Sequence, residues 1–293
     1  MKMSALWVML GCGAEKVADD VEARGEACEV APSPTSQTRM GTEAAGLERT
    51  FRLTVPEADV GERLPVLFAF HGGGGSGQPF PDQEAFDKTG AIVVYPNGVH
   101  IGDNEGDWLL NTGNTGGEDV AFVETLLDGL EARYCIDTDR IYATGYSLGS
   151  MYTYEVACQL NSRFAAVASF AGTMPTNPTS CELTDPIAVM HVHGDEDEII
   201  AYDTAWDWKS WDAVGTMQDI PSLITYWGDK LSCSEVSQAE TRSGEHTVHS
   251  GCEGDVRVEH HRLADAGHWW PDSIAEESTV DVIWGFLSDF SKG

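Results

Sequence analysis

Basic residues are scarce in this chain of 293 residues. Lysine and arginine together number 17, against 48 aspartate and glutamate residues, which gives a formal net charge of -31 at pH 7. Such a charge repels phosphate backbones and anionic membrane surfaces. Nucleic acid is therefore not expected as a partner, and the acidity is interpreted as a solvated surface that resists aggregation.

No apolar run near the N-terminus is long enough to span a bilayer. The run over residues 5–10 follows Lys2 and ends at Gly11 and Cys12. A basic start, a short apolar core and a small residue are the parts of a secretory signal. The Leu-Gly-Cys ending resembles a bacterial lipoprotein signal. We expect residues 1–12 to be a signal, the protein to be extracellular or in the cell envelope, and membrane contact to occur only through a lipid on Cys12.

Cysteine, by contrast, is present in a pattern typical of disulfides. Without Cys12 the number of cysteines is even, as three bridges in an oxidising compartment require. Most of them precede a predicted strand or end a predicted helix, which places them at the sheet edge opposite the expected active site. On this topology we expect the pairs Cys233–Cys252, Cys158–Cys181 and Cys28–Cys135.

The chain divides into a tether and one domain. Residues 13–46 are rich in small and polar residues and contain Pro32 and Pro34, so they are predicted to be a flexible linker. Residues 47–293 are long enough for one large catalytic domain.

Beyond residue 47, short apolar runs alternate with segments of helical periodicity, which predicts an α/β fold with a mostly parallel central sheet flanked by helices. Strands are predicted at 48–55, 64–70, 91–95, 140–144, 164–170, 187–193 and 256–263, and helices at 118–134, 148–160, 220–230 and 279–290.

A nucleophile motif stands between a predicted strand and a predicted helix. Residues 145–149 read Gly-Tyr-Ser-Leu-Gly, the G-x-S-x-G spacing of a turn that exposes a serine. Gly145 and Gly149 let the turn close without steric collision. A glycine-rich turn without catalytic function is the alternative, but the strand, turn and helix together favour Ser147 as a nucleophile.

A glycine-rich turn at residues 71–77 follows the buried strand. Such a turn can direct backbone N–H groups into a site, as an oxyanion hole requires. The alternative, a phosphate-binding loop, lacks the Lys-Ser/Thr pair and the G-x-G-x-x-G pattern. Gly73 and Gly74 are the candidate donors, together with the N–H of Leu148.

The acid and base candidates follow later strands. Asp195 and Asp197 lie just past the strand predicted at 187–193, where a triad acid belongs. His268 lies in the loop after the last predicted strand. The order Ser, Asp, His along the chain is that of the α/β-hydrolase fold.

A metal site is the alternative for the sequence around His191 and His193. The dinuclear hydrolase pattern continues Asp-His, but Glu196 stands where the next histidine is needed. Buried, hydrogen-bonded strand histidines are therefore favoured, and no metal is expected.

Three tryptophans are candidate substrate contacts. Trp108 lies in a long loop, where lining a cleft competes with anchoring the loop to the core. Trp206 lies in residues 202–217, an aromatic segment that suits a rim stacking on a ring or sugar, with plain packing as the alternative. Trp270 lies two residues after His268.

The chain resembles the secreted esterase family that contains feruloyl esterases and poly(3-hydroxybutyrate) depolymerases, over about residues 48 to 290. The matching segments are HGGGGSG at 71–77, VVYPNG at 93–98, EDVAFV at 118–123, YCIDTDRIYATGYSLGSM at 134–151, ACQLNSRFAAVASFAG at 157–172, HVHGDEDEII at 191–200 and AGHWWP at 266–271.

This resemblance selects among the local candidates. The Gly-x-x-Asp pattern of the family implies that Asp197, not Asp195, is the triad acid. Ser150 and Ala266 stand where the family usually has glycine, and both are small replacements.

The function implied is that of an exported serine carboxylic-ester hydrolase of feruloyl-esterase type, acting as a monomer on an ester substrate without metal or organic cofactor. The alternatives are a poly(3-hydroxybutyrate) depolymerase, or a related short-chain polyester or acetyl esterase. A third alternative is a non-catalytic carbohydrate-binding lipoprotein on a hydrolase scaffold. The complete set of triad candidates argues against it.

Overall fold

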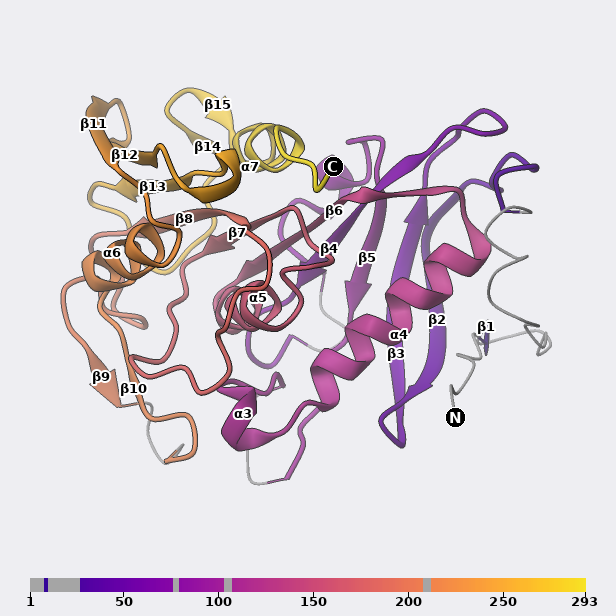
Figure 1. Ribbon diagram of the computed structural model, residues 1–293, viewed down its shortest axis with the longest axis horizontal. Helices are drawn as coiled ribbons and strands as arrows, with labels where there is room; N and C mark the ends of the chain where they lie inside the picture. The colour runs from indigo at the N-terminus through magenta and orange to yellow at the C-terminus, as the bar shows by residue number, and fades with distance from the viewer. Residues whose placement is uncertain (1–7, 10–26, 76–78, 103–106, 208–211) are drawn as a thin grey trace.

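The computed structural model describes residues 8–9, 27–75, 79–102, 107–207 and 212–293 (Figure 1). Most of the expected signal segment, including Cys12, lies outside the described residues. Within the described ranges, no helix is both long and apolar enough to cross a bilayer.

The centre of the fold is an eleven-stranded sheet in the order β1-β2-β3-β5-β4-β6-β7-β8-β13-β12-β11. The six strands from β5 to β13 in this order run parallel to one another, and the strands on either side are antiparallel. The bounds are β1 Val8–Met9, β2 Thr35–Ala44, β3 Leu47–Val55, β4 Leu64–Phe70, β5 Ile92–Pro96, β6 Ile136–Tyr146, β7 Ala166–Phe170, β8 Ala188–Gly194, β11 Glu235–Thr241, β12 Gly244–Ser250 and β13 Val258–Leu263.

Helices cover both faces of this sheet. Figure 1 shows α4, α5 and α6 on one side of it and α7 on the other. The bounds are α2 Gln83–Phe86, α3 Thr112–Thr115, α4 Glu118–Arg133, α5 Leu148–Gln159, α6 Ile220–Lys230, the 3₁₀ turn Glu253–Asp255 and α7 Thr279–Ser288. Two small hairpins complete the fold, β9 Trp206–Asp207 with β10 Thr216–Met217 and β14 Ser273–Ile274 with β15 Glu277–Ser278.

Burial explains the central strands and local chemistry explains the helix ends. All residues of β5, β7 and β8 are buried, as expected for strands covered on both faces. Helix α6 begins where the Asp219 side chain accepts the Ser222 N–H, and α7 begins where Ser278 accepts the Asp281 N–H. The predicted mostly parallel α/β architecture is therefore confirmed.

The linker predicted over residues 13–46 is wrong for its second part. Thr35–Ala44 forms β2, which pairs with β3 along nearly its whole length. Met40, Thr42 and Ala44 are its buried residues, so β2 contributes to the core despite its polar composition. The ordered domain thus begins before Leu47, while residues 13–26 of the predicted linker lie outside the described residues.

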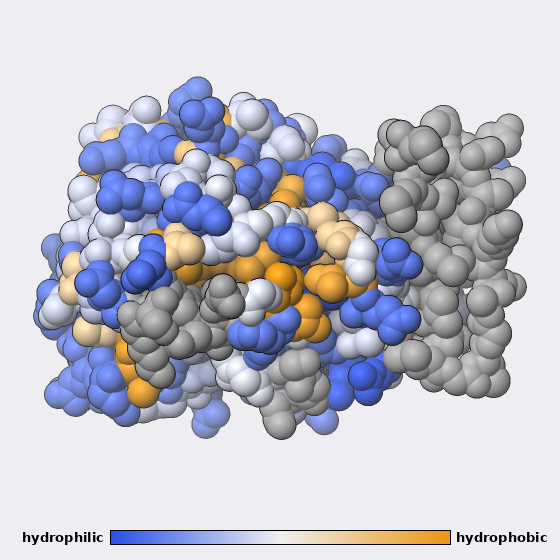
Figure 2. Space-filling view, turned by 90° about the horizontal axis from the view of Figure 1, so that it is seen from below, coloured by the Kyte–Doolittle hydropathy of each residue, from blue (hydrophilic) through white to orange (hydrophobic). Residues whose placement is uncertain are grey.

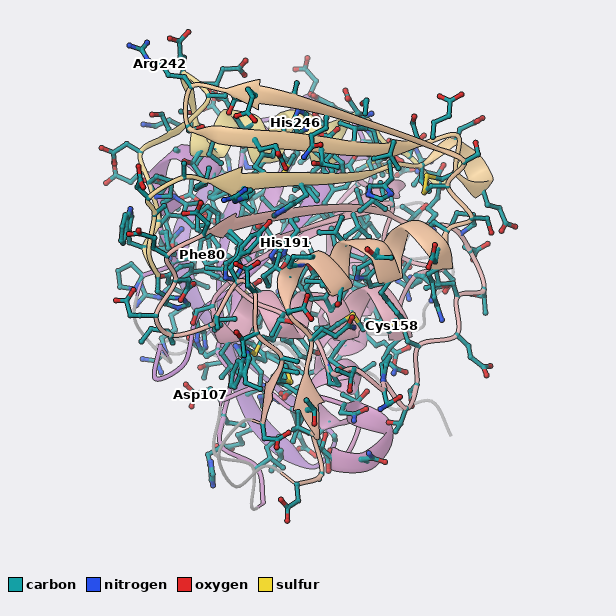
Figure 3. All side chains as sticks on the ribbon, turned by 90° about the vertical axis from the view of Figure 1, so that its left-hand side faces the viewer. Phe80, Asp107, Cys158, His191, Arg242 and His246 are labelled. Atoms are coloured by element: carbon teal, nitrogen blue, oxygen red, sulfur yellow. A yellow bond between two sulfur atoms is a disulfide. The ribbon has the colours of Figure 1, made fainter. Side chains whose placement is uncertain are left out.

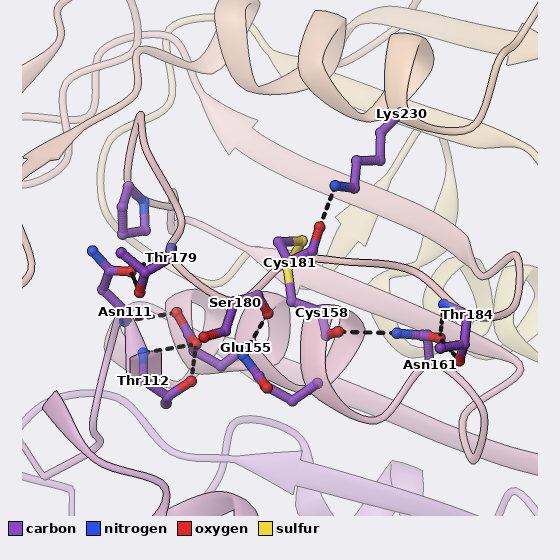
Figure 4. The surroundings of a disulfide bond; sticks show 12 residues. Asn111, Thr112, Glu155, Cys158, Asn161, Thr179, Ser180, Cys181, Thr184 and Lys230 are labelled. Carbon is purple, nitrogen blue, oxygen red and sulfur yellow. Dashed lines mark hydrogen bonds between the residues drawn. A yellow bond between two sulfur atoms is a disulfide. The ribbon is translucent and has the colours of Figure 1, made fainter. Parts of the chain in front are cut away.

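The three disulfides pair as the topology predicted: Cys28–Cys135, Cys158–Cys181 and Cys233–Cys252. The second connects α5 to the segment after β7 (Figure 4). Beside it, the Glu155 carboxylate accepts the backbone N–H groups of Asn111 and Thr112 at 2.7 and 3.2 Å. This cluster fixes the end of the helix that follows the nucleophile motif.

Candidate active site

The G-x-S-x-G motif forms the predicted turn between β6 and α5. Ser147 stands between them with φ 56° and ψ -121°, a positive φ that a residue with a side chain rarely adopts. A Cβ on Gly145 would collide with the carbonyl of Gly149, and one on Gly149 would collide with the carbonyl of Phe70. Gly145 is therefore required by the packing of β6 against α5, and Gly149 by the packing of α5 against β4.

Gly149→Ala is expected to destabilise the protein by at least the roughly 1–3 kcal/mol of core overpacking, because the new methyl group meets backbone rather than a flexible side chain. Thermal unfolding measures this. Gly285→Ala in α7 is the matched control, since a Cβ there meets open space and alanine favours the helix. Equal melting temperatures for the two variants would contradict the prediction.

The three triad candidates meet in one hydrogen-bonded line. His268 Nε2 lies 2.8 Å from Ser147 Oγ, and His268 Nδ1 lies 2.7 Å from Asp197 Oδ2. Asp197 is held by the backbone, since its Oδ1 accepts the N–H groups of Ile199 and Ile200, both at 2.8 Å. This is the geometry in which a histidine takes a proton from a serine while a carboxylate orients the ring.

The contacts distinguish the two aspartates. Asp195 forms an ion pair with Arg262 at 2.9 Å. Asp197 is buried, and although burial by itself raises the pKa of its carboxyl, hydrogen bonds from His193, His268 and the Ile200 N–H hold that pKa well below its ordinary value. Asp197 is thus an ionised acceptor beside His268.

The glycine-rich turn lies against the nucleophile. A Cβ on Gly72 would lie 3.2 Å from Ser147 Cβ, and one on Gly73 would lie 3.7 Å from Leu148 Cδ2. Leu148 is the first residue of α5, so its N–H has no partner within the helix. Gly74 has φ 66°, which suits glycine. The amides of Gly73, Gly74 and Leu148 remain the candidate oxyanion donors.

The prediction that Trp108 lines a cleft is wrong. Its side chain is fully buried, stacks on Tyr152 with 4.8 Å between ring centroids, and donates from Nε1 to the carbonyl of His71 at 2.9 Å. Trp108 anchors its loop to the core, because the neighbouring rings of Phe70 and Tyr152 offer an apolar site and the carbonyl satisfies its one polar atom.

The other two tryptophans are partly exposed. Trp270 packs on Phe170 with 4.6 Å between ring centroids, lies 6.1 Å from the Tyr146 ring, and donates from Nε1 to Asp82 at 2.8 Å. Trp206 lies in β9 and packs partly against the core. Trp208 and Trp211, which share the predicted aromatic rim, lie outside the described residues.

Two exposed apolar side chains beside the triad were not predicted. Ile199 is 59% exposed two residues after Asp197, and Trp269 is 52% exposed next to His268. Figure 2, a view from below, shows apolar residues gathered across the centre of that face of the molecule. The only available signal was sequence proximity to the triad, which says nothing about side-chain direction.

His191 and His193 are fully buried, and their rings bond to protein groups as strand histidines. Elsewhere, the described residues bring one set of metal-ligand types together: His246, Glu259 and His261, with ligand atoms within 4.8 Å of one another. Arg257 pairs with this Glu259 carboxylate, and His246 Nε2 donates to it at 3.0 Å, so protein donors already satisfy it.

The fold and this site define an esterase of the α/β-hydrolase class. The chain belongs to the family described as esterase PHB depolymerase, whose model matches residues 49–228.

Individual relatives agree with this family. The chain is 31% identical to the probable feruloyl esterase C of Aspergillus niger over 251 residues, covering 82% of this chain and 83% of that protein. It is 27% identical over 216 residues to the bifunctional acetylxylan esterase/xylanase XynS20E of Neocallimastix patriciarum, covering 70% of this chain but only 27% of that protein. Among solved structures, the acetyl xylan esterase from Aspergillus awamori shares the fold with a TM-score of 0.60 at 15% identity, over 82% of this chain and 94% of that one.

Proposed function

We propose that the protein is an exported serine carboxylic-ester hydrolase of feruloyl-esterase type that releases hydroxycinnamic acids from plant polysaccharide. The observation that carries the proposal is the continuous hydrogen-bonded line from Ser147 through His268 to Asp197. The three disulfides support export, because such bonds persist in oxidising compartments. One chain supplies all three triad candidates, so the proposed active site needs no second subunit.

In this mechanism the Ser147 hydroxyl attacks the ester carbonyl and His268 takes its proton at Nε2. Asp197 keeps Nδ1 protonated and stabilises the imidazolium that forms. The Leu148 amide, with that of Gly73 or Gly74, binds the oxyanion, where one donor is worth roughly 3–4 kcal/mol in related enzymes. His268 then protonates the leaving alcohol. Water, activated by His268, cleaves the acyl-enzyme and releases the acid.

Aromatic surface beside the triad favours a hydroxycinnamate acyl group. Trp269 and Ile199 are exposed next to His268 and Asp197, and the Tyr146 ring lies 5.5 Å from the His268 ring. Flat aromatic groups stack on such side chains. The name feruloyl esterase C of the fungal relatives agrees with this substrate class.

A polyester depolymerase or acetyl esterase is the second candidate. The exposed Ile199 side chain near Asp197 favours it, because an aliphatic polyester presents apolar surface and no sugar.

The test is hydrolysis of methyl ferulate, short-chain 3-hydroxybutyrate esters and acetylated xylan by the wild type and by Trp269→Ala. For a feruloyl esterase, methyl ferulate gives the highest kcat/KM, and Trp269→Ala lowers that value about 10-fold while changing acetate release little. This factor corresponds to the roughly 1.4 kcal/mol of one stacked ring. Preference for hydroxybutyrate or acetyl esters would replace the feruloyl proposal with the second candidate.

A further inference from the structure

The Asp197 carboxylate has a second histidine neighbour besides His268. His193 Nε2 lies 3.3 Å from Asp197 Oδ2, the same oxygen that His268 contacts, and 2.9 Å from the carbonyl oxygen of Ile200. Both His193 and Asp197 side chains are fully buried. Because a carbonyl oxygen only accepts, the His193 Nε2 atom must carry a hydrogen, which it directs at Ile200 and Asp197 together.

The hydrogen bonds behind His193 then follow in one direction. A neutral His193 that is protonated on Nε2 has a lone pair on Nδ1, and His191 Nε2 lies 3.1 Å from it. His191 must therefore donate from Nε2 and accept at Nδ1. The Tyr154 hydroxyl lies 2.7 Å from that Nδ1 and donates to it. Burial, then the neighbouring His193 and His260, lower the pKa of His191 well below its ordinary value, so the ring is neutral.

We propose that Tyr154, His191 and His193 form a buried positioning relay whose hydrogen bonds all point toward Asp197 and fix the carboxylate that orients His268. The inference rests on the proposed function. The relay starts at Tyr154 on α5, runs along β8 through His191 and His193, and ends at Asp197 in the loop after β8. It therefore links the helix after the nucleophile to the acid of the triad. His191 lies in the interior, between the sheet and α6 (Figure 3).

His193 and His268 both donate to Asp197 Oδ2 and therefore compete for its negative charge. Each donor to this oxygen reduces the negative charge that is left for the His268 imidazolium. When the His193 donor is lost, Asp197 Oδ2 keeps more negative charge to stabilise the imidazolium. At the same time the carboxylate is positioned less well, which lowers kcat.

Other polar groups face the relay from each element packed on it. Ser169 on β7 lies 3.3 Å from His191 Nδ1, His260 on β13 lies 5.5 Å from the His191 ring, and the Tyr202 ring lies 5.9 Å from that of His193. Tyr146, Glu198 and His268 surround the end of the relay that meets the triad. The Arg262 guanidinium lies 5.7 Å from the centre of the Tyr202 ring. Tyr202 donates to His260 at 2.8 Å, so it is engaged apart from the relay.

The decisive variant is Tyr154→Phe, which removes the hydroxyl at the far end of the relay. Without this donor His191 can take the other tautomer, in which its Nε2 no longer donates to His193 Nδ1. The His193 ring, which Ile200 and Asp197 keep protonated on Nε2, is then held less firmly against Asp197. The matched control is Tyr152→Phe on the same helix, because the buried Tyr152 hydroxyl has no hydrogen-bond partner among the described residues.

For Tyr154→Phe we expect kcat on the best ester substrate to fall about 10-fold, the size of one hydrogen bond between neutral groups, with KM unchanged. The acid limb of kcat/KM is expected to move to higher pH. Tyr152→Phe is expected to keep the wild-type kcat and pH profile. Identical profiles for Tyr154→Phe and wild type would overturn the relay.

A second pair of variants acts at His193 itself. His193→Gln retains an N–H donor at about the position of Nε2 and is expected to restore most of the activity that His193→Leu loses, with a pH profile near that of the wild type. If His193→Gln is no more active than His193→Leu, the N–H donor at this position does not support catalysis and the proposed relay is wrong.

Nitrogen NMR of histidine-labelled protein reads the tautomers without any substrate. We expect His191 and His193 both to be protonated on Nε2 alone, and a doubly protonated His193 would overturn the proposal. These outcomes are separate from failure of the proposed function. If the proposed function fails, the wild type cleaves no ester, or Ser147→Ala remains as active as the wild type, and neither result depends on the histidine tautomers.

Discussion

Replacing Ser147 with alanine is expected to lower kcat for ester hydrolysis by roughly a million-fold, the loss seen when a serine nucleophile is removed in related chemistry. The hydroxyl lies 2.8 Å from His268 Nε2, and alanine has no atom that can attack or be deprotonated. Residual rate over water should remain, because the oxyanion donors and the substrate surface are unchanged.

The measurement is initial-rate hydrolysis at enzyme concentrations high enough to detect the residual rate, with circular dichroism to show that the fold is kept. Ser288→Ala is the control: Ser288 is exposed at the end of α7, where its hydroxyl bonds only locally to Gly285, so activity should stay at the wild-type value. A Ser147→Ala enzyme within 10-fold of wild type would remove Ser147 as the nucleophile.

The central strands, the helices packed on them and the turn at Ser147 were the most predictable from sequence. β4 and α6 have the predicted bounds, and the turn at Ser147 forms between the predicted strand and helix. These segments combine strong apolar periodicity with a local rule, such as glycine at a strained turn or a cap residue before a helix. Disulfide pairing was predictable because a parallel sheet brings the ends of its strands and helices to defined edges.

The unpredicted elements are those whose stability comes from pairing rather than composition. β2 is polar and is held by its register with β3, and the β11–β12 hairpin is largely exposed, with every residue of β11 up to Glu240 on the surface. Neither has an apolar pattern to detect. Likewise, strand position alone could not show that His193 turns toward Asp197, since that depends on how the loop after β8 folds back.

Arg49→Met is expected to destabilise the protein by about 3–5 kcal/mol, the cost of leaving one partner of a buried ion pair alone. Arg49 on β3 contacts Asp119 in the first turn of α4 at 2.7 Å, and both side chains are fully buried. Asp119 also accepts the Leu109 N–H at 2.7 Å, so the pair fixes the loop that leads into α4. Denaturant unfolding measures the loss.

The double variant Arg49→Met with Asp119→Asn is expected to be more stable than Arg49→Met alone, because a neutral amide still accepts the Leu109 N–H but leaves no buried charge. Arg242→Met provides the exposed control. Its ion pair with Glu276 has side chains 79% and 63% exposed, so its loss should cost no more than about 0.5 kcal/mol. If Arg49→Met is as mild as Arg242→Met, the buried pair does not stabilise the fold.

Low pH should partly rescue Arg49→Met. Burial, only partly offset by Arg49, raises the pKa of Asp119 above its ordinary value. Removing Arg49 raises this pKa further, so the folded variant binds a proton at a pH where the unfolded chain does not. By linkage, the penalty is fully present above the folded-state pKa and shrinks as pH falls toward the ordinary value of about 4. The difference in unfolding free energy between wild type and variant should therefore be smaller at pH 5 than at pH 8, and a pH-independent difference would show that the lost cation, not the orphaned carboxylate, sets the cost.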